Sequence, residues 1–191
     1  MIYYLLFTHL ISYWATVVFY TIVFNQWSKE SWYVIKNVLI NQCIVTPLYL
    51  PLFYYYPDSL PWYHIVWQLP TIVVLTDIIF YLCHRVFHLN KALYVHVHEQ
   101  HHEYDPPIAS AALYSHPIEH FCINLSSTVF PMFITKSSFF VQIIWTLIAS
   151  INVVVAHSDI HGGQHTKHHK YKTCNYGVGF MLFDRISGTY R

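Results

Sequence analysis

The chain has 191 residues, of which 55% are hydrophobic and only 10% are charged. Soluble domains carry about 25% charged residues, so this composition excludes an ordinary water-soluble protein. The formal net charge of +1 also excludes a nucleic-acid partner, because nucleic-acid-binding proteins present a basic surface to the phosphates. We expect a single membrane-embedded domain that spans residues 1–191.

Two apolar stretches in residues 1–61 are long enough to cross a bilayer, whose core of about 30 Å needs about 20 helical residues. The first, Ile2–Phe24, contains no charged residue and lacks the basic start of a cleaved signal peptide. We expect it to be a retained membrane anchor. The second runs from about Val38 to Tyr56 and contains Pro47 and Pro51, which are expected to kink it.

Three further apolar stretches follow. Trp62–Cys83 ends directly on a histidine, and the polar segment His84–His116 that comes next cannot lie in lipid. Ile118–Ile134 and Phe139–Ala156 are separated by only four residues, which predicts a tight helical hairpin. The sequence therefore predicts an all-α integral membrane protein with about four to five transmembrane or hairpin helices.

The basic residues predict how these helices are oriented, because Lys and Arg concentrate on the cytoplasmic side of a membrane protein. If the spans alternate, Lys136 lies alone on one side. The other side then holds Lys29, Lys36, Arg85, Lys91, Lys167, Lys170, Lys172, Arg185 and Arg191. We expect residues 1–61 to form the N-terminal membrane helices. Residues 62–191 are expected to form the catalytic region, with a cytosolic helical cap that carries most of the histidines.

Thirteen of the 15 histidines lie in two stretches, 84–120 and 157–169, which this topology places on one face of the membrane. Ten of them are spaced as HxxxH or HxxHH: His84, His88, His98, His101, His102, His157, His161, His165, His168 and His169. Residues three or four apart share one face of a helix. Neutral imidazole binds Fe, Zn, Cu and Ni, and ten ligands are too many for one ion. We predict that these ten residues bind a catalytic pair of metal ions.

Other polar residues near these histidines are expected to orient them, because a ligating histidine usually donates its second ring N–H to a carboxylate or carbonyl. Asp77 is the most informative, since an acid inside a membrane span is costly; its alternative role is to bond a neighbouring helix. The other candidates are Glu99, Glu103, Glu119, His116, Asn175 and Asp184. We expect His120 to orient or pack, and His9 and His64 to be structural.

Four stretches of the chain resemble the fatty acid hydroxylase and sterol desaturase superfamily. They are DIIFYLCHRVFH (77–88), HEQHHEYDPP (98–107), SHPIEH (115–120), and HTKHHKYKTCNYG with FDRISGT (165–177 and 183–189). The resemblance covers about residues 70–191. It implies a membrane-bound diiron oxygenase with two Fe ions, with Zn as an alternative metal in the purified protein, and O2 as co-substrate. It also implies an external electron donor such as cytochrome b5 or a similar reductase. The connection from His161 to His165 is shorter than is usual in the family.

The function predicted from these observations is O2-dependent hydroxylation or desaturation of a lipid. The resemblance implies a sterol, as in a C4-methyl oxidase or C5-desaturase, or a fatty acyl chain, and a place in lipid or sterol biosynthesis. It implies the endoplasmic reticulum membrane, with the histidines facing the cytosol. The sequence does not separate hydroxylation from desaturation.

Two alternatives remain open. One is an acyl desaturase of the separate three-box membrane family, which uses fewer histidines than this chain offers. The other is a zinc-binding membrane protein, either a metal transporter or a protease. A transporter is expected to carry its ligands at mid-membrane depth, whereas these histidines flank the predicted spans.

Overall fold

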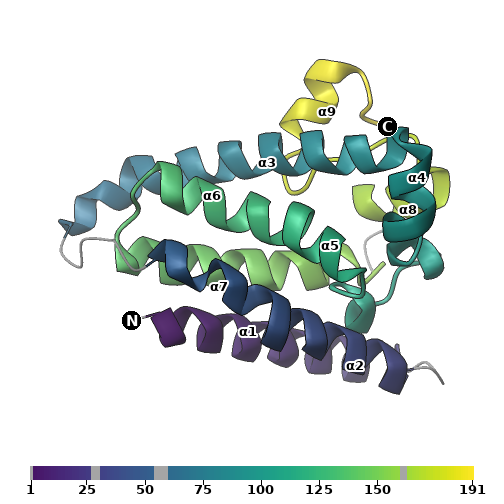
Figure 1. The fold of residues 1–191 in the computed structure, drawn as a ribbon, viewed down its shortest axis with the longest axis horizontal. Helices are drawn as coiled ribbons and strands as arrows, with labels where there is room; N and C mark the ends of the chain where they lie inside the picture. Colours follow the sequence, from purple (N-terminus) through teal and green to yellow (C-terminus); the bar gives the residue numbers. More distant parts are fainter. Residues whose placement is uncertain (1, 27–30, 54–59, 160–162) are drawn as a thin grey trace.

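The computed structural model describes residues 2–26, 31–53, 60–159 and 163–191. Within these ranges the regular structure is entirely helical. The long helices lie side by side, and several short helices gather beyond one end of them (Figure 1). The predicted all-α class is therefore confirmed.

Three helices are long and apolar enough to cross a membrane. They are α1 (Ile2–Val23), α3 (Ile65–Leu89) with the short turn η3 (Trp62–His64) before it, and α7 (Phe139–Ala156). Their outward side chains are largely apolar, and Ile22 and Val66 are 64% and 71% exposed. So much exposed apolar surface is unfavourable in water and suits lipid. These features indicate a membrane protein.

The helices α1 and α7 run in the same direction. At one end the rings of Tyr4 and Phe139 lie 6.4 Å apart, and beyond the other end the side-chain amide of Gln26 donates to the carbonyl of Ser158. The helix α3 points the same way (Figure 1). All three helices therefore deliver their C-terminal ends to the same side of the molecule.

Two segments lead the chain back from the ends of the long helices to the start of the next one (Figure 1). The first of these returning segments, between α1 and α3, is irregular. It begins as α2 (Ser31–Ile40), widens into the π-helical turn η1 (Asn41–Val45) and tightens into the 3-10 helix η2 (Thr46–Phe53). Pro47 and Pro51 lie in this last part. Proline lacks the N–H that a continuous α-helix requires, which explains why the regular α-helix is lost here. The final residues of the predicted span, 54–56, lie outside the described part of the chain, as does Lys29.

The second returning segment is also interrupted. It consists of α5 (Pro117–Glu119), the π-helical turn η7 (His120–Leu125) and α6 (Ser126–Ile134). Residues 135–138 then turn the chain into α7, whose first turn is capped by the hydroxyl of Ser138, which accepts from the backbone N–H of Val141 at 3.4 Å. The helix α6 packs against α7, as the short connection between them predicts.

The short helices form a cap at the end to which α1, α3 and α7 point (Figure 1). They are α4 (Lys91–Leu93), η4 (Tyr94–His98), η5 (His101–Glu103), η6 (Ala109–Ala111) and α8 (Gln164–Tyr171). The helix α9 (Leu182–Ser187) lies alongside α3 (Figure 1). The helix α3 continues to Leu89, beyond the predicted end of the apolar stretch at Cys83. It stops there because Asn90 leaves the helical conformation and caps α4 by accepting from the backbone N–H groups of Ala92 and Leu93. His84 and His88 are therefore carried by the last turns of a long helix.

Candidate metal centre

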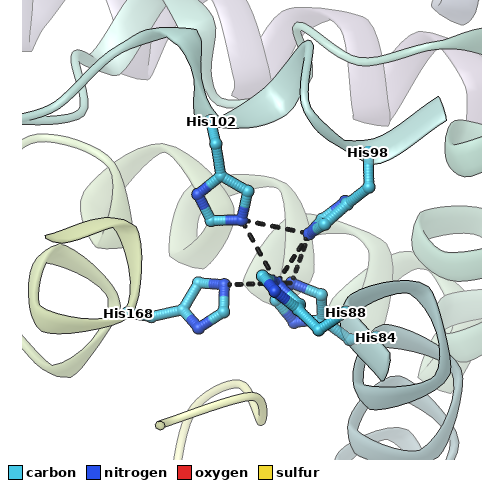
Figure 2. A group of neighbouring side chains, drawn as sticks. All are labelled: His84, His88, His98, His102 and His168. Atoms are coloured by element: carbon cyan, nitrogen blue, oxygen red, sulfur yellow. Dashed lines mark hydrogen bonds between the residues drawn. The ribbon is translucent and has the colours of Figure 1, made fainter. Parts of the chain in front are cut away.

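Nine of the ten predicted ligands form two clusters at the junction of the helix ends and the cap. The first cluster contains His84, His88, His98, His102 and His168, and Figure 2 shows their rings pointing toward one another. The second cluster contains His101, His157, His165 and His169. In each cluster the candidate ligand atoms lie within 4.8 Å of one another. The tenth predicted ligand, His161, lies outside the described residues.

Each HxxHH group divides its histidines between the two clusters. On α8, His165 and His169 are one turn apart and enter the second cluster, whereas His168 enters the first. In the cap, His98 and His102 enter the first cluster and His101 the second. Consecutive residues on a helix project in directions about 100° apart, which lets neighbouring histidines serve different clusters. The clusters adjoin, with the rings of His102 and His169 only 4.7 Å apart.

The spacing of the Nε2 atoms fits ligands around a cation. Among the pairs of the first cluster whose Nε2 atoms are in contact, the separations run from 2.8 Å between His88 and His98 to 3.3 Å between His84 and His88. In the second cluster the Nε2 atoms of His157 and His165 lie 2.9 Å apart. Two nitrogens each bound at about 2.0–2.1 Å and at right angles around one metal lie about 3 Å apart. The clusters therefore have the size of a metal coordination shell.

In five of the nine clustered histidines a backbone carbonyl accepts from the opposite ring nitrogen, Nδ1, which leaves Nε2 of these residues without a proton. The Nδ1 atoms and their acceptor carbonyls are His84 with Tyr176 at 2.7 Å, His101 with Tyr114 at 3.3 Å, His157 with Val153 at 2.7 Å, His168 with Cys174 at 2.8 Å, and His169 with Tyr104 at 3.0 Å. A carbonyl can only accept, so Nδ1 carries the proton. Unprotonated nitrogens that face one another repel unless a cation lies between them. The residues present therefore fit bound metal.

Glu119 lies near one histidine of each cluster, on the Nδ1 side of the ring. The residue is 2% exposed, and its Oε2 lies 2.8 Å from Nδ1 of His98 while its Oε1 lies 4.0 Å from Nδ1 of His101. Burial raises the pKa of Glu119 to about 8, and the nearby His101 opposes this rise. The structure thus places Glu119 where a ligand-orienting carboxylate is expected.

Asp184 shapes the loop that supplies two of the acceptor carbonyls. It is fully buried, and its carboxylate accepts from the backbone N–H groups of Tyr176 at 2.8 Å and Gly177 at 2.6 Å and from the hydroxyl of Thr189 at 2.7 Å. The carbonyl of Tyr176 in turn accepts from His84. Asp184 therefore acts on the cluster through the loop and not by direct contact.

Asn175 fixes the same loop from its other side. Its side chain accepts from the backbone N–H of Arg191 at 2.8 Å and donates to the carbonyl of Gln164 at 3.2 Å. Its backbone φ is 55°, a left-handed conformation that asparagine tolerates better than most residues. The loop is consequently tied both to the start of α8 and to the C-terminal segment.

Asp77 contacts the C-terminal segment as well. Its Oδ2 accepts from the backbone N–H of Phe183 at 2.9 Å, so the described contacts match the alternative role of bonding a neighbouring segment. Glu99 is exposed, Glu103 accepts from the hydroxyl of Tyr114 at 2.8 Å, and His116 caps α5. Within the described residues, none of these three forms a hydrogen bond to a clustered histidine.

The clustered histidines of the cap are neutral at neutral pH. Burial lowers the pKa of His98 and of His157 to about 3. Burial, followed by the neighbouring histidines, lowers the pKa of His165 well below its ordinary value. The neutral imidazole is the form that binds metal.

One feature of the sequence fits a zinc protease: His98–His102 matches HExxH, in which the glutamate serves as a base beside one zinc ion. The structure does not follow that arrangement. Glu99 is exposed, and the two histidines of the motif belong to a group of five.

The particular carbonyl acceptors were not predicted from the sequence. They belong to Tyr104, Tyr114, Val153, Cys174 and Tyr176. The sequence predicts that such acceptors exist, because a ligating histidine usually needs a partner at its second nitrogen. A backbone carbonyl has no residue-type signature, so the sequence does not show which residues supply them.

An apolar cavity of about 500 Å³ lies between α1, η2, α3, α6 and α7. The cavity reaches the clustered histidines at two places. Phe80 lines it, and the ring of Phe80 lies 5.2 Å from that of His84. Val153 also lines it, and its carbonyl accepts from His157. The cavity has the size of a small-molecule site and ends beside both clusters.

The helical membrane fold, the paired histidine clusters and the adjoining apolar cavity define a membrane protein equipped to hold metal ions beside an apolar ligand. The model of the family "Fatty acid hydroxylase" matches residues 69–189, more than half of the chain, and the chain belongs to this family. The predicted family is thereby confirmed.

Three relatives show the range of this family. A Delta(7)-sterol 5(6)-desaturase of Leptosphaeria maculans is 34% identical over 138 residues, which cover 68% of this chain and 38% of the relative. The very-long-chain aldehyde decarbonylase GL1-11 of Oryza sativa subsp. indica is 32% identical and is matched over 86% of this chain and 71% of its own length. Fatty acid hydroxylase domain-containing protein 2 of Macaca fascicularis is 30% identical, with 81% and 50% covered. These names support a lipid oxidoreductase.

The chain spans 38% of the length of the sterol desaturase and 50% of that of the hydroxylase domain-containing protein. No solved structure matches the chain.

Proposed function

We propose that this protein is a membrane-bound diiron oxidoreductase that uses O2 to hydroxylate or desaturate a lipid. The observation that carries the proposal is the pair of adjoining histidine clusters beside an apolar cavity. All-nitrogen ligation suits iron, and the family is known for iron use. The ten histidines predicted from the sequence, His161 included, are the proposed ligands.

Bound iron would supply the activation of O2 and the removal of hydrogen from an unactivated C–H bond. The side chains of the protein have three other tasks. The carbonyls of Tyr176 and Cys174 keep Nε2 of His84 and His168 free of protons. Glu119 holds His98 in position. The apolar wall of the cavity keeps water away and places one part of the lipid next to Phe80 and Val153.

The remaining expectations belong to the same proposal. Residues 1–191 act as one domain, the clusters face the cytosol, and the membrane is that of the endoplasmic reticulum. Electrons come from cytochrome b5 or a similar reductase. The substrate is a sterol or a fatty acyl lipid, and the aldehyde decarbonylase relative adds long-chain aldehydes to the compounds worth assaying.

The decisive experiment is a metal analysis of the full chain, purified in detergent without oxygen and supplied with Fe(II). We expect close to two Fe per chain, as two clusters imply. The double variant His101→Ala, His102→Ala removes one ligand from each cluster and should lose most of this iron. His96→Ala is the matched control, because His96 is exposed and belongs to neither cluster.

Loaded protein should then convert a sterol or acyl lipid, in the presence of O2 and a reductase, to a product with one more oxygen atom or two fewer hydrogens. At most one zinc per chain, retained in the double variant, would contradict the proposal and favour the zinc-binding alternative.

A further inference from the structure

A chain of hydrogen bonds crosses from α1 and η1 to the cavity wall at Ser150. The indole N–H of Trp14 donates to Oε1 of Gln42 at 2.9 Å, which fixes the orientation of that amide. The amide nitrogen Nε2 of Gln42 then donates to the ring nitrogen Nε2 of His9 at 3.1 Å. The proton of His9 must therefore lie on Nδ1, which donates to Oγ of Ser150 at 2.8 Å. His9 and Ser150 both line the cavity.

The hydroxyl hydrogen of Ser150 remains available for another partner. The hydroxyls of Ser12 and Ser127 donate to carbonyls of the preceding helical turn. Within the described residues, Ser150 makes no such bond; the one hydrogen bond found at its Oγ is with His9. Its oxygen accepts there, so its O–H can donate to a ligand.

His120 offers the complementary group at the wall of the same cavity. The hydroxyl of Thr46 donates to the carbonyl of Asn41 at 3.2 Å. Its oxygen therefore accepts from Nε2–H of His120, also at 3.2 Å. Nδ1 of His120 is then an unprotonated acceptor. His120 is 1% exposed, and within the described residues this nitrogen has no hydrogen-bond partner. An acceptor buried in this way is costly until a donor reaches it.

The described residues that line the cavity include no Asp, Glu, Lys or Arg. Nε2 of His120 carries its proton and Nδ1 is an unprotonated acceptor, so this histidine carries no charge. A carboxylate or phosphate placed in the cavity would therefore have no opposite charge beside it, and burying an unpaired ion is strongly unfavourable. The cavity suits a ligand whose polar group is neutral.

We propose that the cavity binds a lipid alcohol, whose hydroxyl hydrogen is donated to Nδ1 of His120 and whose oxygen accepts from the hydroxyl of Ser150. This inference rests on the proposed function and names its substrate class: a hydroxysterol or a long-chain alcohol, and not a free fatty acid or an acyl phosphate ester. Ser150 precedes His157 by seven residues on one helix, about 10 Å along its axis. The hydroxyl is thus an anchor, and the carbon that reacts lies elsewhere in the lipid.

The test is equilibrium binding to the full, metal-loaded chain in lipid nanodiscs, without oxygen or reductant so that no ligand is converted. One arm compares a 3-hydroxysterol with its 3-ketone. The other compares hexadecanol with its methyl ether and with hexadecanoic acid. We expect at least one alcohol to bind roughly tenfold more tightly than its partner that cannot donate, and the arm in which this occurs identifies sterol or acyl alcohol.

Four variants connect this preference to the two residues. Ser150→Ala and His120→Leu should each reduce it to about twofold or less, and His120→Asn should retain part of it because its amide oxygen can still accept. Ser126→Ala is the control: its hydroxyl donates to the carbonyl of Cys122, and it does not line the cavity. Comparing each variant with the wild type cancels differences in membrane partitioning.

An equal affinity for alcohol and non-donor analogue, tighter binding of the acid, or a preference that survives in both Ser150→Ala and His120→Leu would overturn the inference. These outcomes are separable from failure of the proposed function. A chain that holds two irons and shows no alcohol preference overturns the hydroxyl site alone. A chain that prefers alcohols and holds no iron overturns the diiron proposal and leaves the hydroxyl site standing.

Discussion

Oε2 of Glu119 lies 2.8 Å from Nδ1 of His98, and both side chains are almost completely buried. His98 differs in this respect from its neighbours, since five other clustered histidines direct Nδ1 to a backbone carbonyl. A carboxyl group beside Nδ1 can orient the ring of a ligating histidine and tune its basicity. The first cluster therefore has one ligand whose basicity depends on a side chain that can be changed.

Replacing Glu119 with glutamine should weaken metal binding. The variant keeps the size of the side chain and removes its carboxyl group, and loss of such a supporting partner lowers metal affinity about 10–100-fold. Competition with a chromogenic chelator measures the effect. Glu99→Gln is the matched control, because Glu99 is an exposed acid that follows His98 directly in the chain. Equal affinity in wild type and Glu119→Gln would show that Glu119 does not support the ligands.

Replacing Gly177 with alanine should destabilise the protein. A Cβ at this position would lie 2.7 Å from Oδ2 of Asp184 and 3.2 Å from Oδ1 of Asp77, and both carboxylates are held by backbone N–H groups. Overpacking of this kind costs about 1–3 kcal/mol, and each kcal/mol lowers Tm by roughly 2–4 °C in a chain of this size. Gly163→Ala is the control, since a Cβ there meets nothing within 4 Å. A Gly177→Ala protein as stable as the Gly163→Ala protein contradicts the prediction.

Removal of metal should lower the thermal stability. The facing Nε2 atoms repel one another without a cation, and a ligand at 100 times its Kd stabilises the folded state by about 2.7 kcal/mol. Unfolding monitored by tryptophan fluorescence, before and after chelation and again after Fe(II) is returned, checks this. The shift should largely disappear in the His101→Ala, His102→Ala variant. An unchanged Tm after chelation would argue against metal in the clusters.

Local spacing was enough to predict the fold class and the histidines that gather at the site. His84 and His88, or His165 and His169, are one helical turn apart, so each pair shares a face wherever the helix lies. The apolar length of Phe139–Ala156 likewise predicts its helix. These features depend only on residues close together in the chain.

The division of the site into two clusters depends on contacts between distant segments. Nothing in the sequence near His101 shows that it pairs with His157 while His102 faces His88. The link from Asp184 through Tyr176 to His84 joins residues about 100 positions apart. His9 and His120 were expected to be structural or packing residues, and only the packing of α1 and η7 around one cavity reveals their shared position.

His101 and His102 are adjacent in the chain, yet they belong to different clusters. A single peptide unit therefore spans the two groups of ligands, and consecutive Cα atoms are about 3.8 Å apart across a trans peptide bond. Such a link works as a fixed-length spacer between the clusters. An insertion at this one point would change the separation of the two sets of ligands although the chain would keep every histidine.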